Sequence, residues 1–221
     1  MPPPSVPSIL RPLQWQFLHA LAQTPLHAQF YLTGGTTLAE CYLQHRYSED
    51  LDFFTSDVDA VSHAAPLLEQ TATALAAQAT LTRRSASFLE CFLQDAQGER
   101  LELDFALDSP YRIEPLIDHP SLGWRVDSVT DIACNKLSAI CDRTEPKDFV
   151  DLYFLHRDIK PLAEIIPLAK RKHVGLEEYT LAQAFARVRQ LAMLPRMIKP
   201  VTLDMLQGFF TGEAKRLLSD L

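Results

Sequence analysis

The chain has 221 residues, of which 47% are hydrophobic and 22% are charged, so it can bury a full core and carry a small second lobe. No apolar run approaches the roughly 18 residues of a membrane-spanning helix, and the Pro-rich start lacks the pattern of a secretion signal. The net charge of −7 argues against a surface that is uniformly basic for nucleic acid.

The N-terminal region predicts a disordered tail followed by alternating helices and strands. The Pro-rich first twelve residues are expected to be poorly ordered, at least to about Ser8. Apolar residues at helical spacing predict a helix over 13–24. A strand over 28–33 is expected to end at two glycines, and helical periodicity returns over 36–45.

The next elements predict a second strand, a long helix and a hairpin. Residues 50–55 have the pattern of a strand, and the Ala- and Leu-rich stretch 61–79 predicts a helix with Pro66 in its first turn. The segments 87–94 and 100–107 flank a Gly-containing turn, which is typical of a hairpin. These elements together predict a mixed α/β core over residues 1–127.

From Ser128 onward the pattern becomes helical. Ser128, followed three residues later by an aspartate, resembles a capping box that opens a helix over 129–143. A second helix is expected over 146–158, with a proline at its first position. Three or four further helices should carry the chain to its end, so residues 128–221 form a C-terminal helical lobe.

Two carboxylates lie where a strand should place them on one face. Side chains alternate along a strand, so Asp50 and Asp52 are expected to point one way, while Leu51 and Phe53 point the other. Neighbouring ionised carboxylates repel and are costly to desolvate unless a cation compensates them. Mg²⁺ is the usual compensation, because it prefers oxygen ligands and completes its shell with waters and substrate phosphates.

Further residues extend this pattern toward a nucleotide site. "LDF" at 103–105 repeats "LDF" at 51–53, so Asp104 is the natural third carboxylate, although Glu102 lies on the same strand face and could share or replace its role. Gly34 and Gly35 lack Cβ atoms, so their backbone N–H groups can approach a triphosphate closely. The hydroxyl groups that follow are those of Thr36 and Thr37.

The order of these motifs resembles the nucleotidyltransferase superfamily that shares the DNA polymerase β core. Within that superfamily, three stretches closely resemble the AbiEii/AbiGii toxin-like nucleotidyltransferases of bacterial abortive-infection and toxin–antitoxin systems: "YLTGGTTLA", "HRYSEDLDFF" and "KLSAICDRTEPKDFVDLYFL". The resemblance covers roughly residues 28–157. Fourteen residues lie between Gly35 and Asp50, at or just beyond the upper end of the usual gap in the superfamily.

The resemblance implies a fold, a reaction and roles for further residues. The expected fold is α+β, a polymerase β-like mixed sheet flanked by helices, with a helical lobe that completes the active site. Asp50, Asp52 and Asp104 would bind two Mg²⁺ ions. Lys136 would contact substrate phosphates, and Asp148 would act as a base or an orienting group.

The expected reaction transfers NMP from an NTP to an acceptor hydroxyl. RNA is the expected acceptor, with tRNA 3′ ends as a leading candidate, and a cognate antitoxin is an expected partner. Ser48 could donate to a phosphate, whereas Arg46 could line the site or pair with Glu49 or Asp50.

Other interpretations of the same residues are open. Lys147 with Asp151, and Asp148 with Arg143, could be ordinary surface ion pairs. A non-catalytic nucleotide-binding module would keep the fold, although the retention of three carboxylates argues against it. A small molecule or a protein hydroxyl could also replace RNA as the acceptor.

The charges are unevenly distributed along the chain. Residues 156–199 hold nine Lys and Arg against four Asp and Glu, a balance of +5 that leaves −12 for the rest. A solvated helix surface explains this composition, and an RNA-docking face is the alternative. The candidate docking cations are Lys170, Arg171, Lys172, Arg187, Arg189, Arg196 and Lys199.

The cysteines predict the redox environment. Cys41, Cys91, Cys134 and Cys141 include no C-x-x-C pair, so reduced core thiols are favoured over a disulfide framework or a zinc site. A reducing cytoplasm fits this pattern best.

Overall fold

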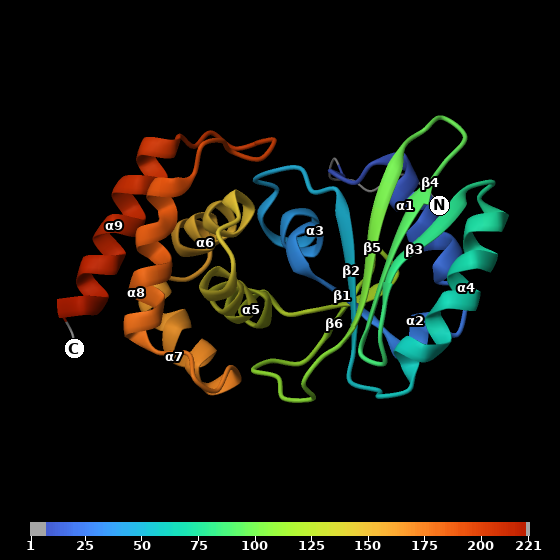
Figure 1. The fold of residues 1–221 in the computed structure, drawn as a ribbon, viewed down its shortest axis with the longest axis horizontal. Helices are drawn as coiled ribbons and strands as arrows, with labels where there is room; N and C mark the ends of the chain where they lie inside the picture. The colour runs from blue at the N-terminus through green and yellow to red at the C-terminus, as the bar shows by residue number, and fades with distance from the viewer. Residues whose placement is uncertain (1–7, 220–221) are drawn as a thin grey trace. The chain divides into compact units, whose positions relative to one another are not determined.

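The computed structural model describes residues 8–219, and the chain divides into two compact units (Figure 1). The first unit comprises three stretches of chain: the residues up to Tyr42, Ser48–Pro110 and Pro115–Ser128. The second comprises two short segments and the C-terminal part: Leu43–Tyr47, Tyr111–Glu114 and the chain from Val129 onward. Two short loops therefore belong to the helical unit although their neighbours in sequence belong to the other.

Within the described residues, the first unit is built on a seven-stranded mixed sheet in the order β3-β4-β5-β2-β1-β7-β6. The strands are β1 (Tyr31–Thr33), β2 (Asp50–Thr55), β3 (Gln78–Arg84), β4 (Phe88–Gln94), β5 (Arg100–Leu107), β6 (Ile117–His119) and β7 (Trp124–Val126). β2 pairs parallel with β5, and β1 pairs parallel with β7, whereas the other neighbours are antiparallel. The mixed α+β fold is thus confirmed.

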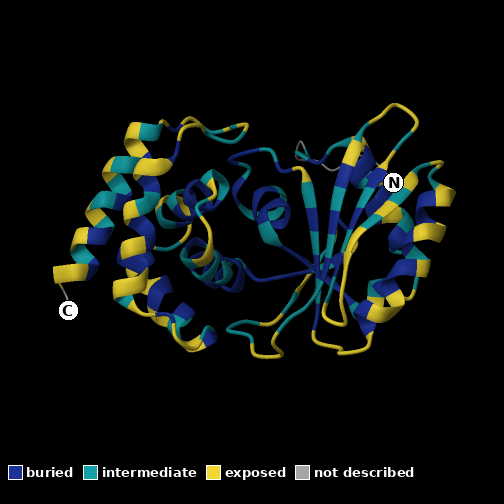
Figure 2. Ribbon diagram, in the orientation of Figure 1, coloured by how far each residue is buried: buried dark blue, intermediate teal, exposed yellow. Residues whose placement is uncertain are grey.

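Helices α1 (Pro12–Leu21), α2 (Leu26–Gln29) and α4 (Ala60–Ala74) pack on the apolar face of this sheet. Phe53 of β2 stacks on Phe105 of β5 with ring centroids 4.6 Å apart, and both side chains are fully buried. Figure 2 shows the buried residues of α4 on the side facing the sheet and its exposed residues on the outer side. This packing fixes which face of β2 and β5 is left for polar side chains.

A short helix, α3 (Gly34–Leu38), follows β1 and continues as a π-helical turn, η1 (Ala39–Leu43). Gly34 has φ +73°, a conformation that favours glycine, so the chain turns from β1 into α3 at this residue. α3 packs against β2, the strand that carries the two predicted aspartates. The helical stretch expected over 36–45 therefore begins two residues earlier, at Gly34, and ends at Leu43, with its second half π-helical.

The second unit is helical, as predicted. Its elements are α5 (Val129–Asp142), α6 (Pro146–Asp158), α7 (Leu162–Lys172), α8 (Glu178–Ala186), the 3₁₀ turn η2 (Arg187–Gln190) and α9 (Leu203–Ser219). Phe210 of α9 lies edge-on to Phe149 of α6, 5.0 Å between ring centroids, and it also contacts Phe185 of α8. None of the described helices combines the length and the apolar character that crossing a membrane would require.

Four further local expectations were wrong. The strand expected over 28–33 begins at Tyr31, because residues 28 and 29 belong to α2. Residues 8–11 are held in place, because the Ile9 N–H donates to Glu40 and Leu10 joins the core; the rest of the predicted tail lies outside the described residues. Pro66 lies inside α4 rather than in its first turn. The helix predicted over 61–79 ends at Ala74, and the last two residues of the predicted range, 78 and 79, belong to β3.

The cysteines behave as the sequence predicts. The structure has free thiols at Cys41, Cys91, Cys134 and Cys141. Burial raises the pKa of Cys41 to about 12, and burial raises that of Cys91 to about 11. These thiols are therefore protonated packing groups at neutral pH.

Candidate active site

The predicted carboxylates share one face of two paired strands in the first unit. In the parallel register of β2 and β5, Asp52 lies opposite Asp104, and Asp50 lies opposite Glu102. Their apolar neighbours on both strands are buried, whereas these four acidic residues are partly exposed. The strand pairing therefore gathers four carboxylates in two rows and gives both Asp104 and Glu102 a position next to an aspartate of β2.

Gly34 lies directly against the carboxylate of Asp52. β1 pairs with β2 so that Thr33 is opposite Asp52, and a Cβ added to Gly34 would lie 1.7 Å from Asp52 Oδ2. Any side chain at this position would displace the carboxylate. The first glycine thus serves two needs, a left-handed backbone and room for Asp52.

Two hydroxyl groups hold Asp50. Ser48 Oγ donates to Asp50 Oδ1 over 3.0 Å, and Thr36 Oγ1 donates to the same atom over 3.2 Å and to the Asp50 carbonyl oxygen. A hydroxyl has one proton to donate, so Thr36 shares its proton between the two oxygens of Asp50 that it contacts. Ser48 and Thr36 together orient the Asp50 carboxylate. Gly35 and Thr37, also predicted for this site, are buried in α3.

The donor set on this face fits a magnesium ion in its chemistry. Asp50, Asp52 and Asp104 offer oxygen atoms alone, which are the ligands that Mg²⁺ prefers. Among residues 8–219, no three His, Cys, Asp or Glu side chains are gathered closely enough to hold a metal by themselves. Mg²⁺ usually takes one or two carboxylates plus waters and substrate phosphates, so the residues present suit an ion that binds together with substrate.

The other two predicted site residues meet in the second unit. Lys136 of α5 donates to Asp148 of α6 over 2.7 Å, and Arg143 donates to the same carboxylate over 2.7 Å. Asp148 is fully buried, and Lys136 is 6% exposed. Burial alone would raise the pKa of Asp148, but Lys136 and Arg143 outweigh it and hold the pKa below its ordinary value.

A second buried aspartate, Asp151, accepts from three basic side chains. Its oxygens lie 2.7 Å from Lys136 Nζ, 2.6 Å and 2.9 Å from the Arg46 guanidinium, and 2.8 Å from His45 Nε2. Burial would raise the pKa of Asp151, yet Arg46 and Lys136 hold it well below the ordinary value. Asp151 is thus ionised and ties the segment Leu43–Tyr47 to α6.

This cluster corrects one interpretation of the sequence. Asp151 contacts Lys136, Arg46 and His45 rather than Lys147, and it is buried, so a surface pair with Lys147 is wrong. Arg46 and Asp151 are 105 residues apart in sequence, so no local pattern indicates their contact.

The basic stretch 156–199 also differs from the expectation. Lys172 is buried with its ammonium 2.7 Å from Asp131, so its predicted place on a cationic surface is wrong. α7 is amphipathic, and Lys172 falls on the buried side that also carries Ile165 and Ala169. Three more of the seven cations form close polar contacts. Lys170 pairs with a glutamate of α8, Arg187 donates to backbone carbonyl groups of α5, and Lys199 pairs with Asp158.

Comparison with known proteins agrees with the motifs. The family model described as "Nucleotidyl transferase AbiEii toxin, Type IV TA system" matches residues 16–219. The uncharacterized protein aq_aa25 of Aquifex aeolicus (strain VF5) is 31% identical over 181 residues, which cover 76% of this chain and 78% of that protein.

Two solved structures share the fold. JHP933 from Helicobacter pylori superposes with a TM-score of 0.60 at 20% identity, over 95% of this chain and 90% of the other. The nucleotidyltransferase toxin MenT4 from Mycobacterium tuberculosis superposes with a TM-score of 0.56 at 17% identity, over 95% and 82%. Both likenesses concern the fold alone.

We expect Gly34→Ala to destabilise the chain more than Gly123→Ala, by about 3 kcal/mol or more against about 1–2 kcal/mol. Both glycines have positive φ, +73° and +66°, but a Cβ at Gly34 collides with Asp52 whereas nothing lies within 4 Å of one at Gly123. Urea unfolding followed by circular dichroism measures the difference. Equal losses would show that Asp52 is free to move aside.

We expect Asp151→Asn to lower the free energy of unfolding by about 3–5 kcal/mol, because buried cations lose their counter-charge. The matched control is Asp158→Asn, which breaks pairs with Arg157 and Lys199 at the surface. That change should cost under about 1 kcal/mol. Urea titrations at pH 7.5 test both variants, and similar costs would contradict the role given to the buried cluster.

His45 should make stability depend on pH. Its ring is buried and its Nδ1 finds no hydrogen-bond partner among the described residues, and this burial outweighs Asp151 and lowers its pKa from 6.5. Folding therefore favours the neutral ring, so the stabilisation is complete above pH 6.5 and falls as the pH drops from there toward the folded pKa. Asp151 does not titrate in that range, since its pKa lies well below its ordinary value.

The check is urea unfolding at pH 7.5 and 5.5. The loss of stability between these two values should be smaller in His45→Gln, which keeps an N–H for Asp151 but does not titrate. His63→Gln, at an exposed position, is the control and should behave like the unaltered chain. A loss in His45→Gln as large as in the unaltered chain would exclude His45 as the source.

Proposed function

The chain belongs to the AbiEii nucleotidyltransferase toxin family, and on that premise we propose that it transfers NMP from an NTP to a hydroxyl group of RNA. The acceptor oxygen forms a bond to the α-phosphorus, and the bond from that phosphorus to the bridging oxygen breaks. Pyrophosphate leaves with the bridging oxygen, and the hydroxyl proton passes to solvent. Such a transfer needs alignment and charge neutralisation more than covalent help from the protein.

One observation carries the proposal. The parallel register of β2 and β5 places Asp52 beside Asp104 on a partly exposed face, and Gly34 leaves the space that the Asp52 carboxylate occupies. A structural role alone would not require acidic residues on both strands, because like charges there are destabilising. This arrangement supports a catalytic protein over a non-catalytic binding module.

Mg²⁺ is the metal that suits these donors, and Asp50, Asp52 and Asp104 would hold it. When bound, the metal supplies charge neutralisation at the phosphates and acidifies the acceptor hydroxyl. The chain itself supplies orientation: Ser48 and Thr36 direct Asp50 by hydrogen bonds. We propose that the backbone N–H groups of Gly34 and Gly35 bind the triphosphate, and that the Thr37 hydroxyl is a further donor to it.

We assign different roles to Lys136 and Asp148. An ammonium group has three donors, and Lys136 uses one on Asp148 and one on Asp151, which leaves a third for a substrate phosphate. A general base works best with a pKa near the working pH, whereas the pKa of Asp148 is lowered. This contrast supports Asp148 as an orienting group for Lys136.

The family supports our proposals for the acceptor, the partner and the compartment. We propose a tRNA 3′ end as the acceptor hydroxyl, because toxins with this resemblance are expected to act on RNA. A cognate antitoxin is the proposed partner, in line with the type IV toxin–antitoxin description of the family. Free thiols agree with action in the cytoplasm, where NTPs and tRNA are found.

The proposal is tested with α-labelled NTPs, total RNA and Mg²⁺, with the label followed into RNA. Asp50→Asn, Asp52→Asn and Asp104→Asn should each lower the rate of labelling by about a hundredfold or more. Asp118→Asn, at an exposed position on β6, removes one charge from the same unit and should keep full labelling. Glu102→Gln decides whether Glu102 shares the role of Asp104.

Three outcomes would contradict parts of the proposal. Full labelling by Asp50→Asn would exclude the metal assignment. Label that appears in a small molecule or a protein instead of RNA would change the acceptor while keeping the reaction. Absence of labelling with all four NTPs, despite NTP binding, would favour the non-catalytic module.

A further inference from the structure

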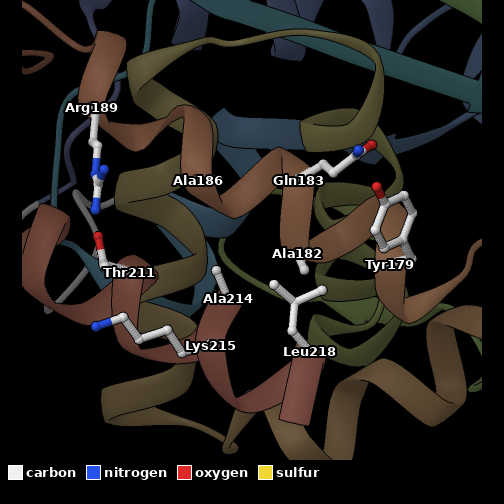
Figure 3. A pocket seen from close by; sticks show the side chains of 9 residues that line it. All are labelled: Tyr179, Ala182, Gln183, Ala186, Arg189, Thr211, Ala214, Lys215 and Leu218. Carbon is white, nitrogen blue, oxygen red and sulfur yellow. The ribbon is translucent and has the colours of Figure 1, made fainter. Parts of the chain in front are cut away.

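A pocket of about 320 Å³ lies between α8 and α9 in the second unit. Its floor consists of small apolar side chains, including Ala182 of α8 and Ala214 of α9, with Leu218 beside them. Figure 3 shows Arg189 and Lys215 toward one end of the pocket and Tyr179 toward the other, with this floor between them. The pocket therefore offers a positive end and an aromatic end on an apolar base.

The two cations of this pocket are available to a ligand. Neither Arg189 nor Lys215 makes a hydrogen bond or an ion pair within residues 8–219, and both are exposed. The acidic side chains nearby on the same helices are already neutralised, because Glu178 pairs with Lys170 and Glu213 pairs with Arg216. The pocket thus carries two uncompensated positive charges, unlike much of the basic stretch 156–199.

Tyr179 is the aromatic group of the pocket. Its side chain is 56% exposed, and it has no ring contact with another described residue. Proteins that bind single-stranded nucleic acid place exposed aromatic rings beside cations, so that bases stack on the rings while the cations follow the phosphates. The pocket offers the same two kinds of group, an exposed tyrosine at one end and two unpaired cations at the other.

We propose that this pocket binds one nucleotide of a single-stranded RNA acceptor, with its base on Tyr179 and its flanking phosphates on Arg189 and Lys215. The volume of about 320 Å³ lies at the small end for ligand sites and suits one nucleotide. A base can enter such a pocket when it is unstacked, which favours a single strand over a duplex. The proposal rests on RNA being the acceptor, and it adds a docking site outside the residues assigned to the reaction.

The test measures binding of a fluorescein-labelled, unstructured RNA 12-mer to the full chain by fluorescence anisotropy. The double variant Arg189→Gln/Lys215→Gln should bind about tenfold more weakly, and the slope of log affinity against log salt should fall by about 1.4. Tyr179→Ala should also weaken binding by about tenfold, whereas Tyr179→Phe keeps the ring and should bind like the unaltered chain. The matched control is Arg84→Gln/Lys160→Gln, which removes two cations elsewhere and should change binding less than twofold.

The outcomes separate this inference from the proposed function. Equal binding by the double variant and its control would overturn the pocket as an RNA site, and so would equal weakening in Tyr179→Phe and Tyr179→Ala. Stronger binding of a duplex than of the single strand would overturn it as well. If the unaltered chain binds the 12-mer through these residues but labels no RNA, the proposed function fails and the pocket stands as an RNA site. If the chain labels RNA but the variants bind the 12-mer as well as the unaltered chain, the pocket fails and the proposed function stands.

Discussion

The second unit depends on the compensation of two buried carboxylates. Asp148 and Asp151 are three residues apart on α6 and fully buried, and each would cost several kcal/mol if it lost its cations. Lys136 of α5 contacts both, so its ion pairs stabilise the observed packing of α5 on α6. Arg46 extends the same network to a loop that joins this unit from the other half of the sequence. The residues that the sequence suggested for catalysis, Lys136 and Asp148, therefore also form ion pairs at the centre of the helical packing.

In the first unit, hydroxyl groups and a glycine position the carboxylates of β2. Ser48 and Thr36 donate hydroxyl protons to Asp50, which fixes the direction of that carboxylate without cancelling its charge. Gly34 makes room for Asp52 by having no side chain. The two acidic clusters therefore differ in the roles that we propose: Asp148 and Asp151 join α5 to α6 by ion pairs, whereas Asp50 and Asp52 are proposed to bind the metal.

Features that depend on neighbouring residues could be predicted from the sequence, whereas contacts between residues far apart in the chain could not. Period-two alternation predicted which residues of β2 and β5 are buried, and the repeated "LDF" indicated Asp104. β3 was missed because its first residues continue an Ala-rich helical pattern, so the change of period is hard to locate. The partners of Asp151 were missed because Arg46 and His45 lie more than 100 residues away, and only the folded chain brings them together.

Charge counts along a sequence also overstate the surface that is free to bind. Lys172 balances a buried aspartate and Arg187 caps the carbonyl groups of α5, so neither can follow an RNA backbone. An acidic chain that presents few uncompensated cations should bind RNA with modest affinity and a weak dependence on salt. The reason is that each contact between a cation and a phosphate raises both the affinity and its dependence on salt. Modest affinity suits an enzyme that modifies many acceptor molecules in turn, because a tightly held product would make its release limit the rate. In the pocket that we propose for RNA, stacking of a base on Tyr179 would supply the part of acceptor recognition that few cations cannot.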